Sequence, residues 1–122
     1  EKIIIHRQNS RKIIFKNPFL KLVNITSVDL NCRFSWNKCD FLLVQKESFY
    51  FVELKWSDIN HAKNQLLNSI KELSESNSII KCYIICSKVA PFIWNNIQKI
   101  KLEFKKMNIQ IVIKQNEYTE TI

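Results

Sequence analysis

The sequence contains no glycine in 122 residues. The P-loop and the dinucleotide-binding fingerprint both require glycine, because only a residue without a side chain lets the backbone approach a phosphate closely. The absence of glycine excludes both motifs and makes chemistry driven by a bound nucleotide improbable.

Cysteine and histidine are scarce, and no two cysteines form a CxxC pair. They occur at Cys32, Cys39, Cys82, Cys86, His6 and His61. Cys82 and Cys86 are predicted to share one face of a buried strand, where core packing is their favoured role; a zinc site and structural disulfides are the alternatives. Free thiols fit a reducing compartment, so we expect a cytoplasmic protein.

Long apolar runs are also absent. No segment is long enough to span a membrane, and the first residues contain no signal-peptide core. The apolar content of 46% supports one hydrophobic core. The length of the chain fits a single domain over residues 1–122. Because the chain begins with Glu rather than Met, we expect it to be trimmed or part of a larger protein.

Acidic residues are outnumbered by basic ones. There are 19 Lys and Arg against 11 Asp and Glu, which gives a net charge of +8. Such a charge favours an anionic partner, and nucleic acid is the first candidate. The abundance of Ile, Asn and Lys leaves the alternative that the charge reflects a genomic composition bias.

Two apolar runs carry charged residues where charge is costly. Asp40 lies near the start of the first run, which ends at Val44; Glu53 and Lys55 lie in the second, which begins at Phe49. Runs rich in Phe, Val and Tyr are typical of buried strands, and a buried charge requires a partner or a metal. Because side chains alternate along a strand, we expect Glu53 and Lys55 on the same face.

A hairpin between the two runs would bring the two acids together. If Gln45 faces Ser48 across the turn, then Asp40 faces Glu53 on the same face of the sheet, with Cβ atoms about 5 Å apart. The Lys-Glu pair at 46–47 is a poor two-residue turn, so we expect a longer loop or a bulge there.

The remaining pattern predicts an α/β layered domain with a mixed sheet. Apolar spacing predicts helices at about 59–73 and 91–107, and β-branched runs indicate strands around residues 3–5, 13–15, 20–30, 79–86 and 109–113. The polar residues 116–122 are expected to form a frayed tail.

The paired acids indicate a candidate metal site. Asp40 and Glu53 would form a hard oxygen site suited to Mg²⁺ or Mn²⁺, and the backbone carbonyl of Leu54 could add a ligand. A metal there would polarise a phosphoryl oxygen and lower the pKa of a bound water. Lys55 would orient the nucleophile or stabilise the charge of the transition state. The alternative is a buried ion pair of the lysine with an acid.

The pattern also resembles a known family. Asp40 is followed, after twelve further residues, by the triplet Glu-Leu-Lys at 53–55, and a helix is predicted directly after the triplet. This arrangement resembles the PD-(D/E)xK nuclease superfamily. That group includes restriction endonucleases, Holliday junction resolvases and RecB-type nuclease domains. Many members carry a Gln on the helix, and Gln65 lies in the matching place. A second ExK triplet at 103–105 falls inside the second predicted helix. The resemblance covers about residues 38–90.

The resemblance implies a restriction endonuclease-like three-layer core of αβββαβ order, with a central mixed sheet flanked by the two helices. It implies an endonuclease that hydrolyses phosphodiester bonds, of DNA more than RNA, with Mg²⁺ or Mn²⁺ at Asp40, Glu53 and the Leu54 carbonyl. Asp40, Glu53, Lys55 and Gln65 would be the catalytic residues.

Two features depart from the family pattern. Cys39 stands where a Pro usually precedes the Asp. The opening helix, which in several members supplies another Glu, is not evident, and only Glu1 or Asp29 could replace that residue.

Contacts with nucleic acid are expected from four further residues, Arg33, Lys38, His61 and Lys63. The short chain leaves little room for a separate recognition domain, so a homodimer or a specificity-giving partner is expected. The alternative function is a nuclease-fold module that binds nucleic acid or a partner protein without cutting.

Overall fold

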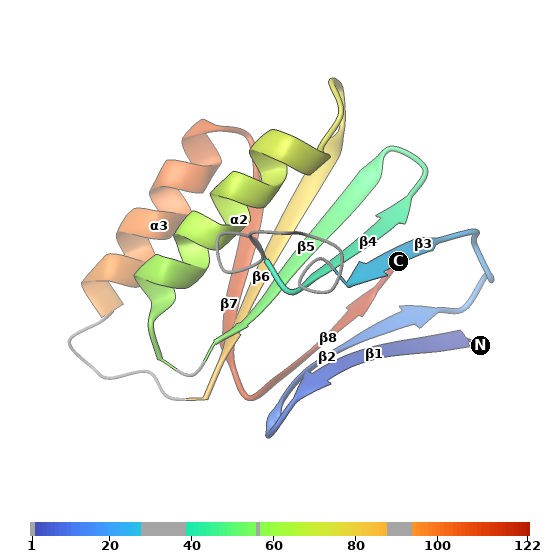
Figure 1. Ribbon diagram of the computed structural model, residues 1–122, viewed down its shortest axis with the longest axis horizontal. Helices are drawn as coiled ribbons and strands as arrows, with labels where there is room; N and C mark the ends of the chain where they lie inside the picture. Colours follow the sequence, from blue (N-terminus) through green and yellow to red (C-terminus); the bar gives the residue numbers. More distant parts are fainter. Residues whose placement is uncertain (1, 28–38, 56, 88–93) are drawn as a thin grey trace.

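The computed structural model describes residues 2–27, 39–55, 57–87 and 94–122. Over these residues the chain is an α/β protein with two helices, a five-stranded sheet and a three-stranded sheet. Figure 1 shows three layers, in which the five-stranded sheet lies between the helices and the smaller sheet. The predicted α/β class is confirmed, whereas the composition of the layers differs from the expectation.

The five-stranded sheet has the order β3-β4-β5-β6-β7. Its strands are β3 (Asn24–Ser27), β4 (Phe41–Gln45), β5 (Ser48–Lys55), β6 (Ile79–Cys86) and β7 (Gln110–Gln115). Neighbours from β3 to β5 are antiparallel, and neighbours from β5 to β7 are parallel. The sheet is therefore mixed, as the sequence predicts.

Two helices lie in the connections between the parallel strands, where crossovers are required. Helix α2 spans Ile59–Leu73, which are the predicted bounds, and helix α3 spans Trp94–Lys106 within the predicted range 91–107. Neither of these described helices is both long and apolar enough to cross a membrane.

Both helices pack on the same face of the five-stranded sheet, so the expectation that they flank it is wrong (Figure 1). The strand order explains the difference. β5, β6 and β7 follow one another across the sheet, and right-handed connections between successive parallel strands pass over a single face. The other face is covered by the three-stranded sheet.

The three-stranded sheet joins the two ends of the described chain. Its strands are β1 (Lys2–Gln8), β2 (Arg11–Asn17) and β8 (Glu117–Thr121). β1 and β2 form an antiparallel hairpin, and β8 pairs with β2 in parallel.

The C-terminal segment is a strand, which corrects the prediction that residues 116–122 fray. The residues of β8 alternate between exposed and half-buried, because one side of the strand packs toward the five-stranded sheet. Ile122 is buried on that side, and Tyr83 of β6 donates a hydrogen bond of 2.6 Å from its hydroxyl to Glu120. The partner strand β2 lies at the other end of the sequence, where local patterning gives no sign of it.

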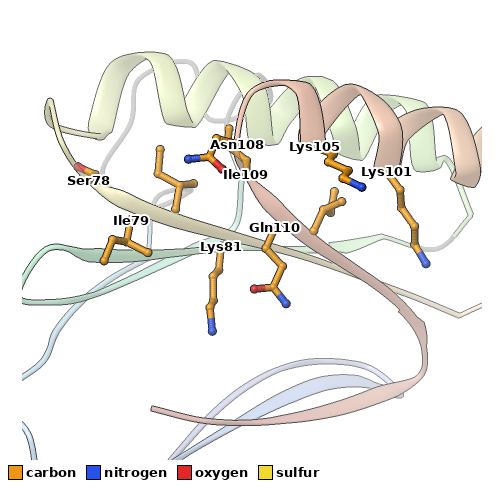
Figure 2. A pocket seen from close by; sticks show the side chains of 10 residues that line it. Ser78, Ile79, Lys81, Lys101, Lys105, Asn108, Ile109 and Gln110 are labelled. Carbon is orange, nitrogen blue, oxygen red and sulfur yellow. The ribbon is translucent and has the colours of Figure 1, made fainter.

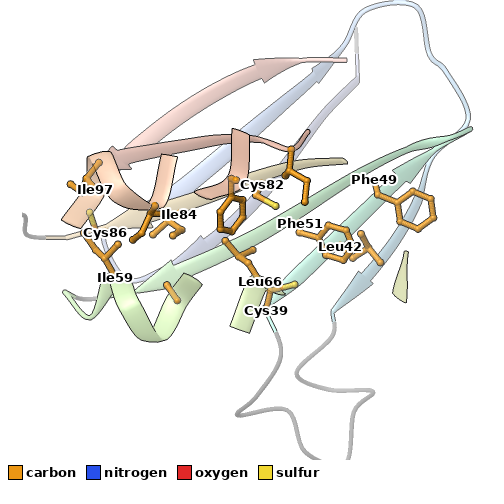
Figure 3. Close-up of a cluster of buried hydrophobic side chains, with 14 residues drawn as sticks. Cys39, Leu42, Phe49, Phe51, Ile59, Leu66, Cys82, Ile84, Cys86 and Ile97 are labelled. Atoms are coloured by element: carbon orange, nitrogen blue, oxygen red, sulfur yellow. The ribbon is translucent and has the colours of Figure 1, made fainter. Parts of the chain in front are cut away.

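Two hydrophobic cores lie on the two faces of the five-stranded sheet. The core beneath the helices includes Phe51, Leu66 and Phe104, which have no exposed surface (Figure 3). The core between the two sheets includes Phe15 and Tyr83, whose rings meet edge to face with centroids 5.7 Å apart. The central sheet is thus buried on both sides, and its charged residues need partners.

The β4–β5 hairpin turns in only two residues, Lys46 and Glu47, so the expected longer loop or bulge does not form. Lys46 adopts a φ of 56°, the left-handed conformation that tight hairpin turns demand. Gln45 faces Ser48 directly across the turn, and the predicted register is confirmed.

Candidate active site

Asp40 and Glu53 lie at the open end of the β4–β5 hairpin. The hairpin keeps one register as far as Phe41, which faces Val52. The next residue, Asp40, lies in the bend that precedes β4, where it would face Glu53 if the register continued. Glu53 shares the helix-facing side of β5 with Phe51, and only 1% of it is exposed. Both predicted acids lie close enough to Cys39 for their charges to act on its thiol, so the structure brings them to the same region.

A hydrogen bond fixes the carboxylate of Asp40 against β5. Its Oδ2 accepts the backbone N–H of Leu54 at 2.9 Å. In an antiparallel pair, the N–H and C=O of one residue point to the same side of the strand. The carbonyl of Leu54 is therefore directed toward the side of β5 where Asp40 lies.

Lys55 and Gln65 are brought together as the spacing predicts. The ammonium group of Lys55 donates a hydrogen bond of 3.2 Å to Oε1 of Gln65. Lys55 is half-buried at the end of β5, and Gln65 is buried in the second turn of α2. This bond holds the lysine on the same side of the sheet as Glu53.

Helix α2 is positioned by bonds at its start and on its buried side. Asp58 caps the helix, and its Oδ1 accepts the backbone N–H of His61 at 3.0 Å. The buried hydroxyl of Ser69 donates to the carbonyl of Gln65 at 2.8 Å and accepts the N–H of Cys39 at 2.7 Å. Ser69 thus ties the helix to the residue that precedes Asp40.

Cys39 is a buried thiol beside the two acids. Burial raises the pKa of Cys39 to about 12, and the charges of Glu53 and of Asp40 add to the increase. Cys82 and Cys86 are also buried free thiols beneath the helices, which confirms their predicted role in core packing. Cys32 lies outside the described residues.

His6 is a neighbour of the site that the sequence did not indicate. It lies on β1, and its ring stacks on that of Phe41 with centroids 4.6 Å apart and an interplanar angle of 17°. Burial lowers the pKa of His6, and the nearby charge of Asp40 opposes this decrease. Nothing in the local sequence points to this contact, because it depends on how the two sheets pack.

The residues expected to touch nucleic acid are only partly described. Lys63 forms an ion pair of 3.6 Å with Glu103, which joins α2 to α3. The side chain of His61 is half-buried near the start of α2. The second ExK triplet is confirmed to lie in α3. Four further predicted residues lie outside the described part of the chain: Glu1, Asp29, Arg33 and Lys38.

The donor atoms at the hairpin fit a hard cation. Within residues 2–27, 39–55, 57–87 and 94–122, no group of three or more His, Cys, Asp or Glu side chains is arranged to hold a metal. The available set is two carboxylates and a main-chain carbonyl, all of them oxygen. Mg²⁺ and Mn²⁺ suit such a set, because Mg²⁺ is usually held by one or two carboxylates and keeps several waters.

Comparison with known proteins leaves the function to be argued from the site. No protein-family model, no curated protein and no solved structure matches this chain. The arrangement of Asp40, Glu53, Lys55 and Gln65 is therefore the basis for a functional proposal.

Proposed function

We propose that this protein is a divalent-metal-dependent endonuclease that hydrolyses phosphodiester bonds of nucleic acid, DNA in preference to RNA. One observation carries the proposal. Asp40 and Glu53 lie in one region at the open end of the β4–β5 hairpin, and Lys55 joins them there through its bond to Gln65.

The order of elements around the site supports the proposal. The succession β3, β4, β5, α2 and β6 follows the βββαβ portion of the αβββαβ order that the resemblance implies. The first three strands are antiparallel, and β6 adds in parallel beside β5. Asp40 precedes the second of these strands, and Glu53 and Lys55 end the third.

Each residue has a chemical role in this proposal. Asp40, Glu53 and the carbonyl of Leu54 would hold Mg²⁺ or Mn²⁺, which supplies a Lewis acid and a water of lowered pKa. The ammonium of Lys55 stabilises negative charge that develops on the phosphate. Gln65 accepts a hydrogen bond from that ammonium and so sets where the charge of Lys55 lies.

The charge and size of the chain set its expected partners. A net charge of +8 favours association with nucleic acid. We place the protein in the cytoplasm of a bacterium or archaeon or in a phage-infected cell, and we assign sequence specificity to a homodimer or to a separate partner.

The proposal is tested by cleavage of plasmid DNA in Mn²⁺ and by titration calorimetry with Mn²⁺ alone. We expect Glu53→Gln to lose both metal binding and cleavage. Lys55→Met should keep metal binding and lose roughly 100- to 1,000-fold in cleavage rate. The matched control is Glu103→Gln in the α3 triplet, which makes the same chemical change outside the site and should cleave like the wild type.

Two outcomes would overturn the proposal. If wild type and both site variants cleave at the same rate, the cleavage does not come from this site. If the wild type binds no Mn²⁺ and cuts neither DNA nor RNA while still binding them, the non-catalytic nucleic-acid-binding module is the better function.

A further inference from the structure

A hollow of about 600 Å³ opens at the end of the sheet away from Asp40 and Glu53. Its polar lining consists of Ser78, Lys81, Lys101, Lys105, Asn108 and Gln110, and the rest of the lining is isoleucine. These residues come from the starts of β6 and β7 and from the C-terminal half of α3 (Figure 2). The proposed nuclease function uses none of them.

The register of the sheet separates the hollow from the candidate active site. Glu53 faces Ile84 on β6, whereas Ile79 at the hollow faces Ser48 at the other end of β5. Ile84 comes five residues after Ile79 along the extended strand, which corresponds to roughly 17 Å. A ligand that occupies the hollow is therefore not at the reacting centre.

The lining is strongly basic. It contains three lysines and no carboxylate. Lys101 and Lys105 are one helical turn apart on α3, while Lys81 comes from β6, where its ammonium lies 5.9 Å from the centre of the Tyr50 ring. Glu103 lies between the two α3 lysines in sequence, but its carboxylate pairs with Lys63 of α2, on another side of the helix.

The positions of the lysines favour an extended polyanion over a small anion. In Figure 2, Lys101 and Lys105 extend from α3, whereas Lys81 and Gln110 point to the other side of the sheet. Lysine side chains that come from two layers of the fold can contact successive phosphates of one polyanion, and this fits them better than a single phosphate does. The polar groups of Ser78, Asn108 and Gln110 are of the kinds that contact phosphate and sugar.

We propose that this hollow binds the sugar–phosphate backbone of a nucleic acid whose neighbouring segment lies at the candidate active site. The inference rests on the proposed function for its ligand, and it assigns a second contact. A separation of roughly 17 Å corresponds to about five base pairs of duplex rise.

The test compares two triple variants of equal charge. Lys81, Lys101 and Lys105 are replaced by Gln in one, and the exposed residues Lys2, Lys16 and Lys21 in the other. Binding of a fluorescent 20-base-pair DNA is measured by anisotropy in EDTA, over a series of salt concentrations, so that cleavage cannot interfere. Each phosphate contact contributes about 0.9 to the slope of log K against log salt.

We expect the hollow variant to lower this slope by about 2 to 3 relative to the wild type, and the control to lower it by less than 1. Thermal unfolding of both variants checks that the fold persists. If the hollow variant fails to fold, the single variant Lys105→Glu on the exposed side of α3 replaces it, with Lys16→Glu as its control. Equal slopes for the hollow variant and its control would overturn the inference.

The outcome is independent of catalysis. If cleavage requires Glu53 but the slopes of the two triple variants are equal, the nuclease proposal stands and the second contact is wrong. If no cleavage occurs but the slope of log K against log salt falls only for the hollow variant, the contact stands and the nuclease proposal is wrong.

Discussion

The ammonium group of Lys55 donates a hydrogen bond of 3.2 Å to the amide oxygen of Gln65. A strand residue and a helix residue are thereby joined across the end of the sheet where Asp40 and Glu53 lie. Gln65 is neutral, so it fixes the position of the lysine without neutralising its charge. We therefore treat Gln65 as a positioning residue that acts through Lys55.

Replacement of Gln65 should lower the cleavage rate through misplacement of Lys55. We expect Gln65→Ala to reduce kcat by roughly 10- to 100-fold with little change in KM or in Mn²⁺ binding. Gln65→Asn keeps a neutral amide acceptor on the same turn of α2 and should lose less rate than Gln65→Ala. Steady-state kinetics and titration calorimetry measure these effects. Equal losses in the two variants would show that the bond to Lys55 has no role in positioning.

Asp40 has a structural role and a proposed metal-binding role, which two substitutions separate. Asp40→Asn keeps an oxygen acceptor for the N–H of Leu54, whereas Asp40→Ala leaves that group without it. In urea denaturation we expect Asp40→Ala to lower the free energy of unfolding by about 1–3 kcal/mol, and Asp40→Asn to lower it by less than about 1 kcal/mol.

Both Asp40 variants should lose the increase in Tm that Mn²⁺ gives the wild type, because a metal that binds only the folded state stabilises it. A thermal-shift series in Mn²⁺ measures this. If Asp40→Asn keeps the full Mn²⁺-dependent shift, Asp40 is not a metal ligand.

His6 should make the protein less stable in acid. Burial lowers the pKa of the folded-state imidazole below its ordinary value of 6.5, so below that pH the unfolded chain binds a proton that the folded protein does not. The free energy of unfolding should therefore fall as the pH decreases from about 6.5 through the lower folded-state pKa.

The matched variant for this pH effect is His6→Phe, which keeps an aromatic ring to stack on Phe41. Urea denaturation at a series of pH values from 7.5 to 5 should show a smaller decrease for the variant than for the wild type. Superimposable pH profiles of the two proteins would contradict the prediction.

Removal of the C-terminal strand should destabilise the whole domain. Deletion of residues 117–122 exposes the core that Ile122 covers and removes the acceptor that Glu120 provides to Tyr83, so we expect a loss of roughly 3 kcal/mol or more. Tyr83→Phe alone should cost about 1 kcal/mol. The control Thr121→Ala changes an exposed side chain of the same strand and should shift stability by less than about 0.5 kcal/mol. A deletion variant with unchanged Tm would show that the segment is dispensable.

The sequence was sufficient to predict the hairpin register and helix α2. Two-residue alternation and the position of the turn determine which residues face each other, and the predicted register holds from Gln45 and Ser48 to Phe41 and Val52. The apolar spacing of α2 likewise places Gln65 close to Lys55. These features depend on neighbours in the sequence, which local patterns describe well.

The misplaced features depend on contacts between distant segments. The φ of 56° at Lys46 is unfavourable for a lysine and is enforced by the strands on either side of the turn. The strand at 117–121 pairs with Arg11–Asn17 at the far end of the chain. His6 reaches Phe41 only because the two sheets stack. The side on which α3 packs follows from the strand order, which the pattern of strands and helices does not specify.

The pairing of β2 with β8 has a consequence for the order of assembly during synthesis. β2 ends at Asn17, yet its parallel partner spans Glu117–Thr121 and emerges from the ribosome about a hundred residues later. The smaller sheet therefore has a high contact order, and non-local pairing of this kind is slow. We expect the helices and the five-stranded sheet to fold first. The N-terminal hairpin then lacks its third strand until β8 has been synthesised.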